Sequence, residues 1–299
     1  MFIIYDIMIN KHMSRRGFMK VQSEMKKPEK KNYAILIVSL LLFIIAGFGI
    51  AGYFLLDYRQ TDILYNSVKT SYTTTDIPEY EEPEDDGFPD FDVDIDGLIE
   101  ANPDFLCWLY YEDGKIDYPV VKEREDDING WMHSAFDGSS KKAGTIFMPY
   151  DADSSFCDMN TFLYGHNMAN GSMFGSLKLI YRNPKENYKD PYFYIWTKDY
   201  EKIKYRVISV YVVNKNSSMY AVPLSDEGYE KYIADVLNSG SMSGFIPFTG
   251  IEKTAMDESS PIVSLSTCYG YAGTSNRLLV QGVEIDRRPY KEGTLSDNG

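Results

Sequence analysis

The hydrophobic and polar positions divide this chain into one long apolar run and, after a polar interval, a series of short ones. Tyr33 to Leu56 is an uncharged, mostly apolar stretch of 24 residues, which would span roughly 36 Å as a helix rising about 1.5 Å per residue. That length is enough to cross a bilayer with some tilt. We therefore expect residues 33–56 to form a transmembrane helix.

The charges on either side of the apolar run indicate its orientation. The 32 residues before it carry eight Lys and Arg, whereas Asp57 to Asp96 contain only Arg59 and Lys69. The positive-inside rule then places residues 1–32 in the cytoplasm as a basic tail and the rest of the chain outside the cell. A cleaved signal peptide is the alternative. The run is longer than a signal-peptide core and no small-residue cleavage pattern follows it, which favours an uncleaved signal anchor.

The segment after the apolar run is polar and acidic. Six Asp and Glu residues lie between Pro78 and Pro89, with too little apolar surface to offset the entropy of ordering them, and their like charges repel. We expect residues 57–91 to form an extended extracellular stalk.

Residues 92–286 show the pattern of a single, mainly β domain, followed by a C-terminal tail at residues 287–299. Eight short runs are rich in β-branched and aromatic residues and are bounded by Gly, Pro, Asn or Asp. The expected strands are Leu106–Tyr111, Lys115–Val121, Thr145–Met148, Asn160–Tyr164, Tyr192–Trp196, Ile203–Val213, Pro261–Cys268 and Arg277–Ile285. Eight short strands favour a closed barrel or a sandwich.

Helices are expected to be few. Asp226–Asn238 places its apolar residues near one face, with Ser225 available as an N-cap and Gly240 just past the end. Asp94–Ala101 and Met173–Ile180 are shorter candidates.

Charge and cysteine content restrict the function. The net charge of −14 consists of +5 for residues 1–56 and −19 beyond them, so the extracellular part is not expected to bind nucleic acid. The odd cysteine count leaves at least one free thiol among Cys107, Cys157 and Cys268. Three scattered His and three scattered Cys show no close ligand spacing, so we expect neither a metal site nor a cofactor.

Three residues together supply the groups needed for acyl transfer. Cys268 ends one apolar run, His166 follows another, and Arg277 begins the last. A thiolate attacks a carbonyl, an imidazole protonates the leaving amine, and a cation stabilises the oxyanion. Side chains at strand ends can meet at one mouth of a barrel. Taken singly, each of these residue types is more often structural, and His12 and His133 are interpreted as structural because the sequence shows no catalytic partner for them.

The segments around these residues resemble those of sortases. Ser264–Cys268 is similar to the Thr-Leu-x-Thr-Cys signature of that family, and Asn160–Met168 resembles its histidine segment. Gly171–Leu177 is similar to the continuation seen in class B members. Further similarities to class B are found at Asn102-Pro103-Asp104, at Trp108 and at Ile116–Val121.

Two positions depart from the family pattern. Ser264 stands where Thr is usual, which keeps a hydroxyl, and Tyr269-Gly270-Tyr271 follows the cysteine where a small polar residue is more usual. The second departure bears on substrate contacts more than on the chemistry.

The resemblance implies an eight-stranded, sortase-type β-barrel with a few peripheral helices, preceded by the transmembrane helix. It also implies roles for three residues: Cys268 as nucleophile, His166 as general acid and base, and Arg277 as the group that stabilises the oxyanion and substrate. Ser266 and Thr267 match positions that help shape the substrate groove, and Asn167 is a further candidate for substrate binding or for orienting His166.

The implied function is that of a membrane-anchored cysteine transpeptidase of a Gram-positive cell surface. Such an enzyme cleaves the C-terminal sorting motif of exported proteins through a thioester and transfers them to a peptidoglycan amine, or to another subunit in pilus assembly. Its partners are therefore exported proteins, a peptidoglycan precursor and, through residues 33–56, the membrane. Two alternatives stay open: another wall-acting cysteine peptidase or transpeptidase, and a non-enzymatic surface module that binds a ligand.

Overall fold

The computed structural model describes residues 30–74, 87–183, 189–220, 225–242, 260–270 and 273–290, together with Glu186. The chain divides into two compact units, Met1–Leu55 and Leu56–Gly299. The expected basic tail lies almost wholly outside the described residues.

The first unit contains the N-terminal part of helix α2 (Lys30–Tyr72). The stretch expected to cross the membrane, residues 33–56, is helical throughout, and its large apolar side chains are exposed. Exposed apolar residues in a helix of this length are typical of a membrane span, because lipid can cover them. By length and composition, this is the helix within the described ranges that is suited to cross a bilayer.

The second unit begins with the C-terminal part of the same helix, and here the structure differs from the expected stalk. Tyr65 is only 5% exposed, and its hydroxyl donates a hydrogen bond to the Gly144 carbonyl at 2.6 Å. The helix buries a stripe with a spacing of three and four residues, which places its members on one face. The members of the stripe are Tyr58, Thr61, Tyr65, Val68 and Tyr72.

An extended stalk is therefore wrong for residues 57–74. After the helix, β1 (Thr73–Thr74) pairs with β2 (Asp92–Val93), so the chain enters the folded unit well before Asp92. The acidic residues on which the expectation rested lie mostly between 75 and 86, outside the described residues.

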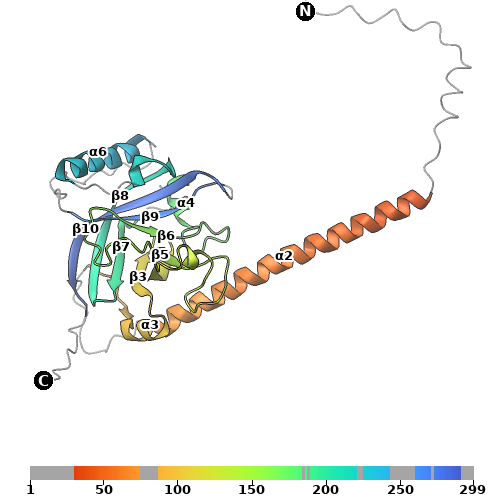
Figure 1. Cartoon of the computed structure of the whole chain (residues 1–299), viewed down its shortest axis with the longest axis horizontal. Coiled ribbons are helices and arrows are strands. Elements are labelled where there is room, and N and C mark those ends of the chain that lie inside the picture. Colours follow the sequence, from red (N-terminus) through yellow and green to blue (C-terminus); the bar gives the residue numbers. More distant parts are fainter. Residues whose placement is uncertain are drawn as a thin grey trace, which may run out of the picture. The chain divides into compact units, whose positions relative to one another are not determined.

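Eight strands close into a barrel in the order β10-β8-β7-β3-β4-β5-β6-β9 (Figure 1). All eight expected strands are present. The β4–β5 and β6–β9 pairs are parallel, and the other pairs are antiparallel. The strands are β3 (Phe105–Tyr111), β4 (Ile116–Lys122), β5 (Ile146–Met148), β6 (Thr161–Tyr164), β7 (Tyr192–Thr197), β8 (Glu201–Asn214), β9 (Ile262–Cys268) and β10 (Asn276–Pro289).

The last strand extends the folded unit into the expected C-terminal tail. β10 continues to Pro289, and the Tyr290 hydroxyl accepts a hydrogen bond from the Val93 N–H at 2.6 Å. Residues 287–290 therefore close the barrel against the start of the domain.

Three α-helices accompany the barrel, in addition to α2, within the described ranges. They are α3 (Ile95–Ala101), α4 (Leu177–Arg182) and α6 (Asp226–Met242). Asp94 caps α3 by accepting a hydrogen bond from the Gly97 N–H at 3.0 Å. The expected helix at Met173–Ile180 begins only at Leu177; Met173 has a φ of 52°, outside the α-helical range, and forms an isolated bridge with Asn167.

A buried polar network holds α6 on the barrel. The Tyr232 hydroxyl accepts hydrogen bonds from the side-chain amides of Asn160 and Gln281, each at 2.7 Å, and donates one to the Met219 carbonyl at 3.1 Å. The Ser264 hydroxyl donates to Asn160 at 2.6 Å and accepts from Gln281 at 2.8 Å. The serine at this signature position thus keeps a hydroxyl that is fully used in the core.

Candidate active site

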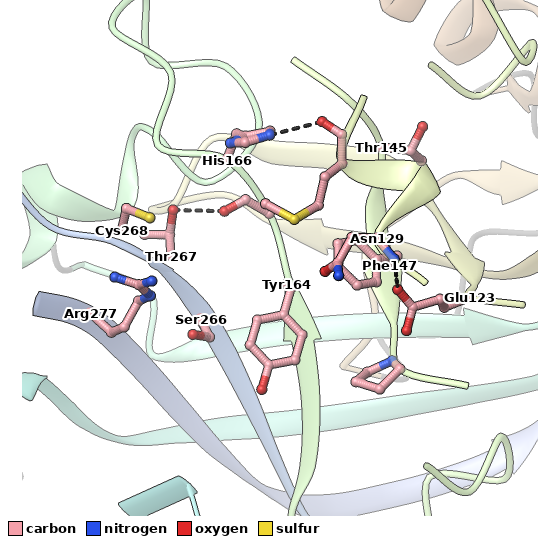
Figure 2. Close-up of a pocket in the computed structure, with 13 residues that line it drawn as sticks. Glu123, Asn129, Thr145, Phe147, Tyr164, His166, Ser266, Thr267, Cys268 and Arg277 are labelled. Carbon is pink, nitrogen blue, oxygen red and sulfur yellow. Dashed lines mark hydrogen bonds between the residues drawn. The ribbon is translucent and has the colours of Figure 1, made fainter. Parts of the chain in front are cut away.

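The strand order explains how distant segments of the chain meet. β9 lies between β6 and β10, so the strand that ends in Cys268 has the strand that leads to His166 on one side and the strand that carries Arg277 on the other. The structure brings these three residues together around one cavity of about 280 Å³ (Figure 2).

Cys268 and His166 become neighbours through a parallel register. Tyr164 of β6 pairs with Ser266 of β9, and the Gly165 N–H continues the pairing by donating to the Ser266 carbonyl at 3.2 Å. Each reactive residue lies two positions beyond that pair, on strands that run the same way about 4.8 Å apart. Equal offsets on parallel strands place the thiol and the imidazole at the same end of the barrel.

Cys268 and Arg277 are direct cross-strand partners of the antiparallel pair β9–β10. Side chains of such partners project to the same face, with Cβ atoms about 4.5–5.5 Å apart. Nη1 of Arg277 is held by the carbonyls of Thr274 at 2.8 Å and Asn276 at 3.0 Å. Nε and Nη2 have no hydrogen-bond partner in the part of the chain that the structure describes, so these donors are available to a ligand in the cavity.

His166 is half-buried, and its Nε2 donates to the Met132 carbonyl at 2.9 Å. Burial lowers the pKa of His166 below its ordinary value; the bond to Met132 opposes this effect, and the charge of His133 adds to it. The rings of the two histidines lie 6.2 Å apart. Gly165 is required next to His166, because a Cβ there would lie 2.8 Å from the Phe174 ring.

Asn167 binds the backbone of the cysteine rather than the histidine ring. Its side-chain amide donates to the Cys268 carbonyl at 2.8 Å, and the Lys178 ammonium lies 3.3 Å from the Asn167 amide oxygen. It is not among the residues that line the cavity. This geometry therefore favours neither of the roles expected for Asn167, namely orienting the imidazole and binding the substrate directly.

Ser266 and Thr267 both line the cavity. The Ser266 hydroxyl lies 2.8 Å from the Tyr220 hydroxyl, and the Thr267 hydroxyl donates to the Gly165 carbonyl at 2.7 Å. The second bond joins the cysteine strand to the loop that carries His166, so Thr267 helps to keep the two strand ends together.

Tyr269, one of the departures from the family pattern, is partly buried against the hydrophobic core and contacts α4. Its ring meets Tyr181 edge-on at 5.3 Å between centroids, and the Arg182 guanidinium lies 5.5 Å from its centroid. The tyrosine therefore anchors the start of the loop after Cys268.

The other two cysteines lie elsewhere. Cys107 is fully buried in β3, where burial raises its pKa, and Cys157 is exposed; all three thiols are free. Because the thiolate is the reactive form, Cys107 is inert as a nucleophile.

Several residues at or beside the cavity were not expected from the sequence, among them Glu123, Met132, His133 and Tyr220. Met132 acts through its main-chain carbonyl, which any residue type provides, and His133 and Tyr220 approach the site only through the closure of the barrel. No local sequence motif marks such contacts.

The comparisons with known proteins identify the family to which the chain is similar. A family model described as the sortase domain matches residues 111–285, which is more than half of the chain. Sortase B of Listeria monocytogenes is 29% identical over 164 residues, an alignment that spans 54% of this chain and 59% of the relative, so the chain matches less than two thirds of that protein's length.

Solved structures give the same result. Sortase B of Clostridium perfringens is 28% identical with a TM-score of 0.55, covering 64% of this chain and 99% of that one. Sortase B of Bacillus anthracis shares the fold at a TM-score of 0.59 and 24% identity, covering 78% of this chain and 99% of that one.

Proposed function

Because this chain belongs to the sortase family and its relatives are class B members, we propose that it is a membrane-anchored cysteine transpeptidase. The observation that carries the proposal is the position of Cys268 between His166 and Arg277 at the ends of three adjacent strands, where all three residues line one cavity. A thiol, a proton carrier and a cation around one space are the groups that acyl transfer from a peptide requires.

In the proposed reaction, the Cys268 thiolate attacks the carbonyl carbon of a Thr in the sorting motif of an exported protein. The carbonyl oxygen gains negative charge beside the Arg277 guanidinium, whose Nη1 is already held by two backbone carbonyls. His166 gives a proton to the leaving amine as the C–N bond breaks, which leaves a thioester on Cys268. An amine of a peptidoglycan precursor then attacks the thioester, loses a proton to His166 and releases the thiolate.

Membrane attachment through residues 33–56 belongs to the same proposal. With residues 1–32 in the cytoplasm, the barrel lies outside the cell, where exported substrates and lipid-linked wall precursors are held at the same surface. Confinement to that surface raises the effective concentration of enzyme, substrate and acceptor. Transfer to a pilus subunit in place of the wall amine would use the same thioester.

The test uses the full chain in lipid nanodiscs and donor–quencher peptides built on Asn-Pro-Xaa-Thr. We expect cleavage, a mass-detectable acyl adduct on Cys268, and transfer to an added amine. Cys268→Ala should abolish all three, whereas Cys157→Ala is the matched control and should leave them unchanged. Persistence of cleavage in Cys268→Ala would exclude the mechanism. If the wild type binds the peptide as tightly as Cys268→Ala does and cleaves none of it, the result would favour a binding module.

A further inference from the structure

The cavity beside Cys268 holds an acidic side chain at a distance from the three reactive groups. Glu123 lines it together with Asn129, Phe147 and Pro149, and it is only 7% exposed. Figure 2 shows Glu123 on the far side of Tyr164 from Cys268 and Arg277. The cavity therefore carries a guanidinium at one end and a carboxylate at the other.

The basic residues next to Glu123 in sequence do not neutralise it. The Lys122 ammonium contacts the Ala152 carbonyl and lies 3.5 Å from the Met148 sulfur. Arg124 is paired with Asp104. Successive side chains of an extended segment project to opposite sides, so both cations point away from the side on which Glu123 reaches the cavity.

One oxygen of Glu123 has a structural role. Oε1 accepts a hydrogen bond from the Asn129 N–H, and Asn129 has a φ of 64°, so the carboxylate stabilises the tight loop that follows β4. The other oxygen, Oε2, has no hydrogen-bond partner within the described ranges. Oε2 is not one of the fully buried, unpartnered side-chain oxygens of the described residues, so it keeps contact with solvent and can accept a hydrogen bond from a donor that a ligand brings into the cavity.

We propose that Glu123 is a specificity-determining residue that binds a cationic side chain, Lys or Arg, of the peptide substrate. The inference rests on the proposed function and names a substrate feature for the same site. An ion pair there would form among apolar neighbours, Met132, Phe147 and Pro149, where charges attract more strongly than in water. Arg277 repels a cation at the other end of the cavity, so a positive side chain of the peptide is more favourable near Glu123 than near Arg277.

The amine that resolves the thioester is a less suitable occupant of this position. Its nitrogen must reach the carbonyl carbon held on Cys268, at the opposite end of the cavity from Glu123 in Figure 2. The cation at Glu123 therefore belongs to the acyl-donor peptide. The net charge of −19 beyond residue 56 also attracts cationic peptides from solution.

The test compares Glu123→Gln with the wild type, as full chains in nanodiscs. Glutamine keeps one acceptor oxygen for the Asn129 N–H, removes the charge and replaces the second oxygen by an NH2 group, which cannot accept a hydrogen bond from a cation. The probes are donor–quencher peptides with Lys, norleucine or Glu at each position other than the Thr. In the wild type, kcat/KM for Lys should exceed that for norleucine by at least about tenfold at one position, since close charge pairs couple by about 1.5 kcal/mol or more.

In Glu123→Gln the ratio of kcat/KM for the Lys peptide to that for the norleucine peptide should fall to within about twofold. The matched control is Glu125→Gln, an exposed acidic residue of the same loop, which should retain the preference. The same preference in Glu123→Gln, or the absence of any preferred Lys position in the wild type, would overturn the inference.

A separate binding measurement distinguishes failure of the proposed cation site from failure of the proposed transpeptidase function. Fluorescence anisotropy with the Cys268→Ala chain measures peptide affinity without turnover. If the wild type cleaves nothing, tighter binding of a Lys peptide that is lost on adding Glu123→Gln would still support the cation site. Equal binding of Lys and norleucine peptides would reject it.

Discussion

The side-chain amide of Asn167 donates a 2.8 Å hydrogen bond to the main-chain carbonyl of Cys268. The residue after the histidine thus holds the backbone of the nucleophile, so the loop after β6 and the end of β9 are joined at the residues that react. Asn167 is a positioning residue in this arrangement.

Loss of that bond should slow catalysis without unfolding the barrel. We expect Asn167→Ala to lower kcat by about 10- to 100-fold with little change in KM, because small displacements of a nucleophile are costly. Asn170→Ala, an exposed position of the same loop, is the matched control. Steady-state kinetics on the best peptide measure the effect, and a kcat equal to that of the wild type would rule out the positioning role.

Replacement of Arg277 by lysine keeps the charge but removes the planar fork. Arginine holds the two carbonyls with Nη1 and keeps Nε and Nη2 for the oxyanion, whereas lysine has a single nitrogen that cannot occupy both places, so kcat/KM should fall by about 100- to 1,000-fold. Arg206→Lys in β8 controls for a generic loss of arginine. Undiminished turnover in Arg277→Lys would argue against oxyanion stabilisation.

Helix α2 should contribute to the stability of the barrel as well as to its location. Tyr65→Ala removes a buried ring and its bond to Gly144, and should lower the free energy of unfolding by about 3–5 kcal/mol. Ile63→Ala, at a 60% exposed position of the same helix, should cost no more than about 0.5 kcal/mol. Denaturant unfolding measures both.

A truncation series tests the same contact. A chain beginning at Leu56 should fold, whereas one beginning at Asp92 should be destabilised, since it lacks the stripe that includes Tyr65. Equal stability of the two truncated chains would show that the helix only tethers.

His133 should influence the protonation of His166. The charge of His133 disfavours a second positive charge nearby, so His133→Gln should raise the pKa of His166, whereas burial, the larger cause, keeps that pKa below its ordinary value. An NMR titration of the histidine ring protons reads this directly, with Ser134→Ala as control. If the protonated imidazole serves the leaving amine, the loss of activity with rising pH should shift upward by the same amount. A pKa that stays the same or falls would contradict the electrostatic coupling.

The fold was largely predictable because its signals are local. Each barrel strand combines β-branched and aromatic residues with flanking turn residues, and all eight expected strands occur. The prediction that Cys268, His166 and Arg277 converge also rested on local signals, namely a reactive residue at the end of each apolar run. Their convergence depends on which strands are neighbours in the barrel. The resemblance to sortases implied that arrangement, whereas the spacing of the residues alone does not predict it.

The remaining features depend on contacts between distant segments. The residues of the helical stripe that includes Tyr65 recur in the sequence at spacings of three and four. The acidic residues further along favoured an extended stalk for all of residues 57–91, although they follow the end of the helix. Glu123 carries no motif, and its position in the cavity follows from the parallel pairing of β4 with β5 and the turn at Asn129.

The shared offset of His166 and Cys268 from the Tyr164–Ser266 pair has a consequence for protein engineering. Insertion of a single residue after Tyr164 would leave every strand intact and yet turn the imidazole to the other side of the sheet. A second insertion after Ser266, made to compensate, would have to restore both the spacing between the thiol and the imidazole and the side of the sheet to which they project. The positions of His166 and Cys268 are thus set by the number of residues that follow the Tyr164–Ser266 pair on each strand. Transfer of this pair to another barrel requires two neighbouring parallel strands with the same number of residues between the shared pair and each reactive residue.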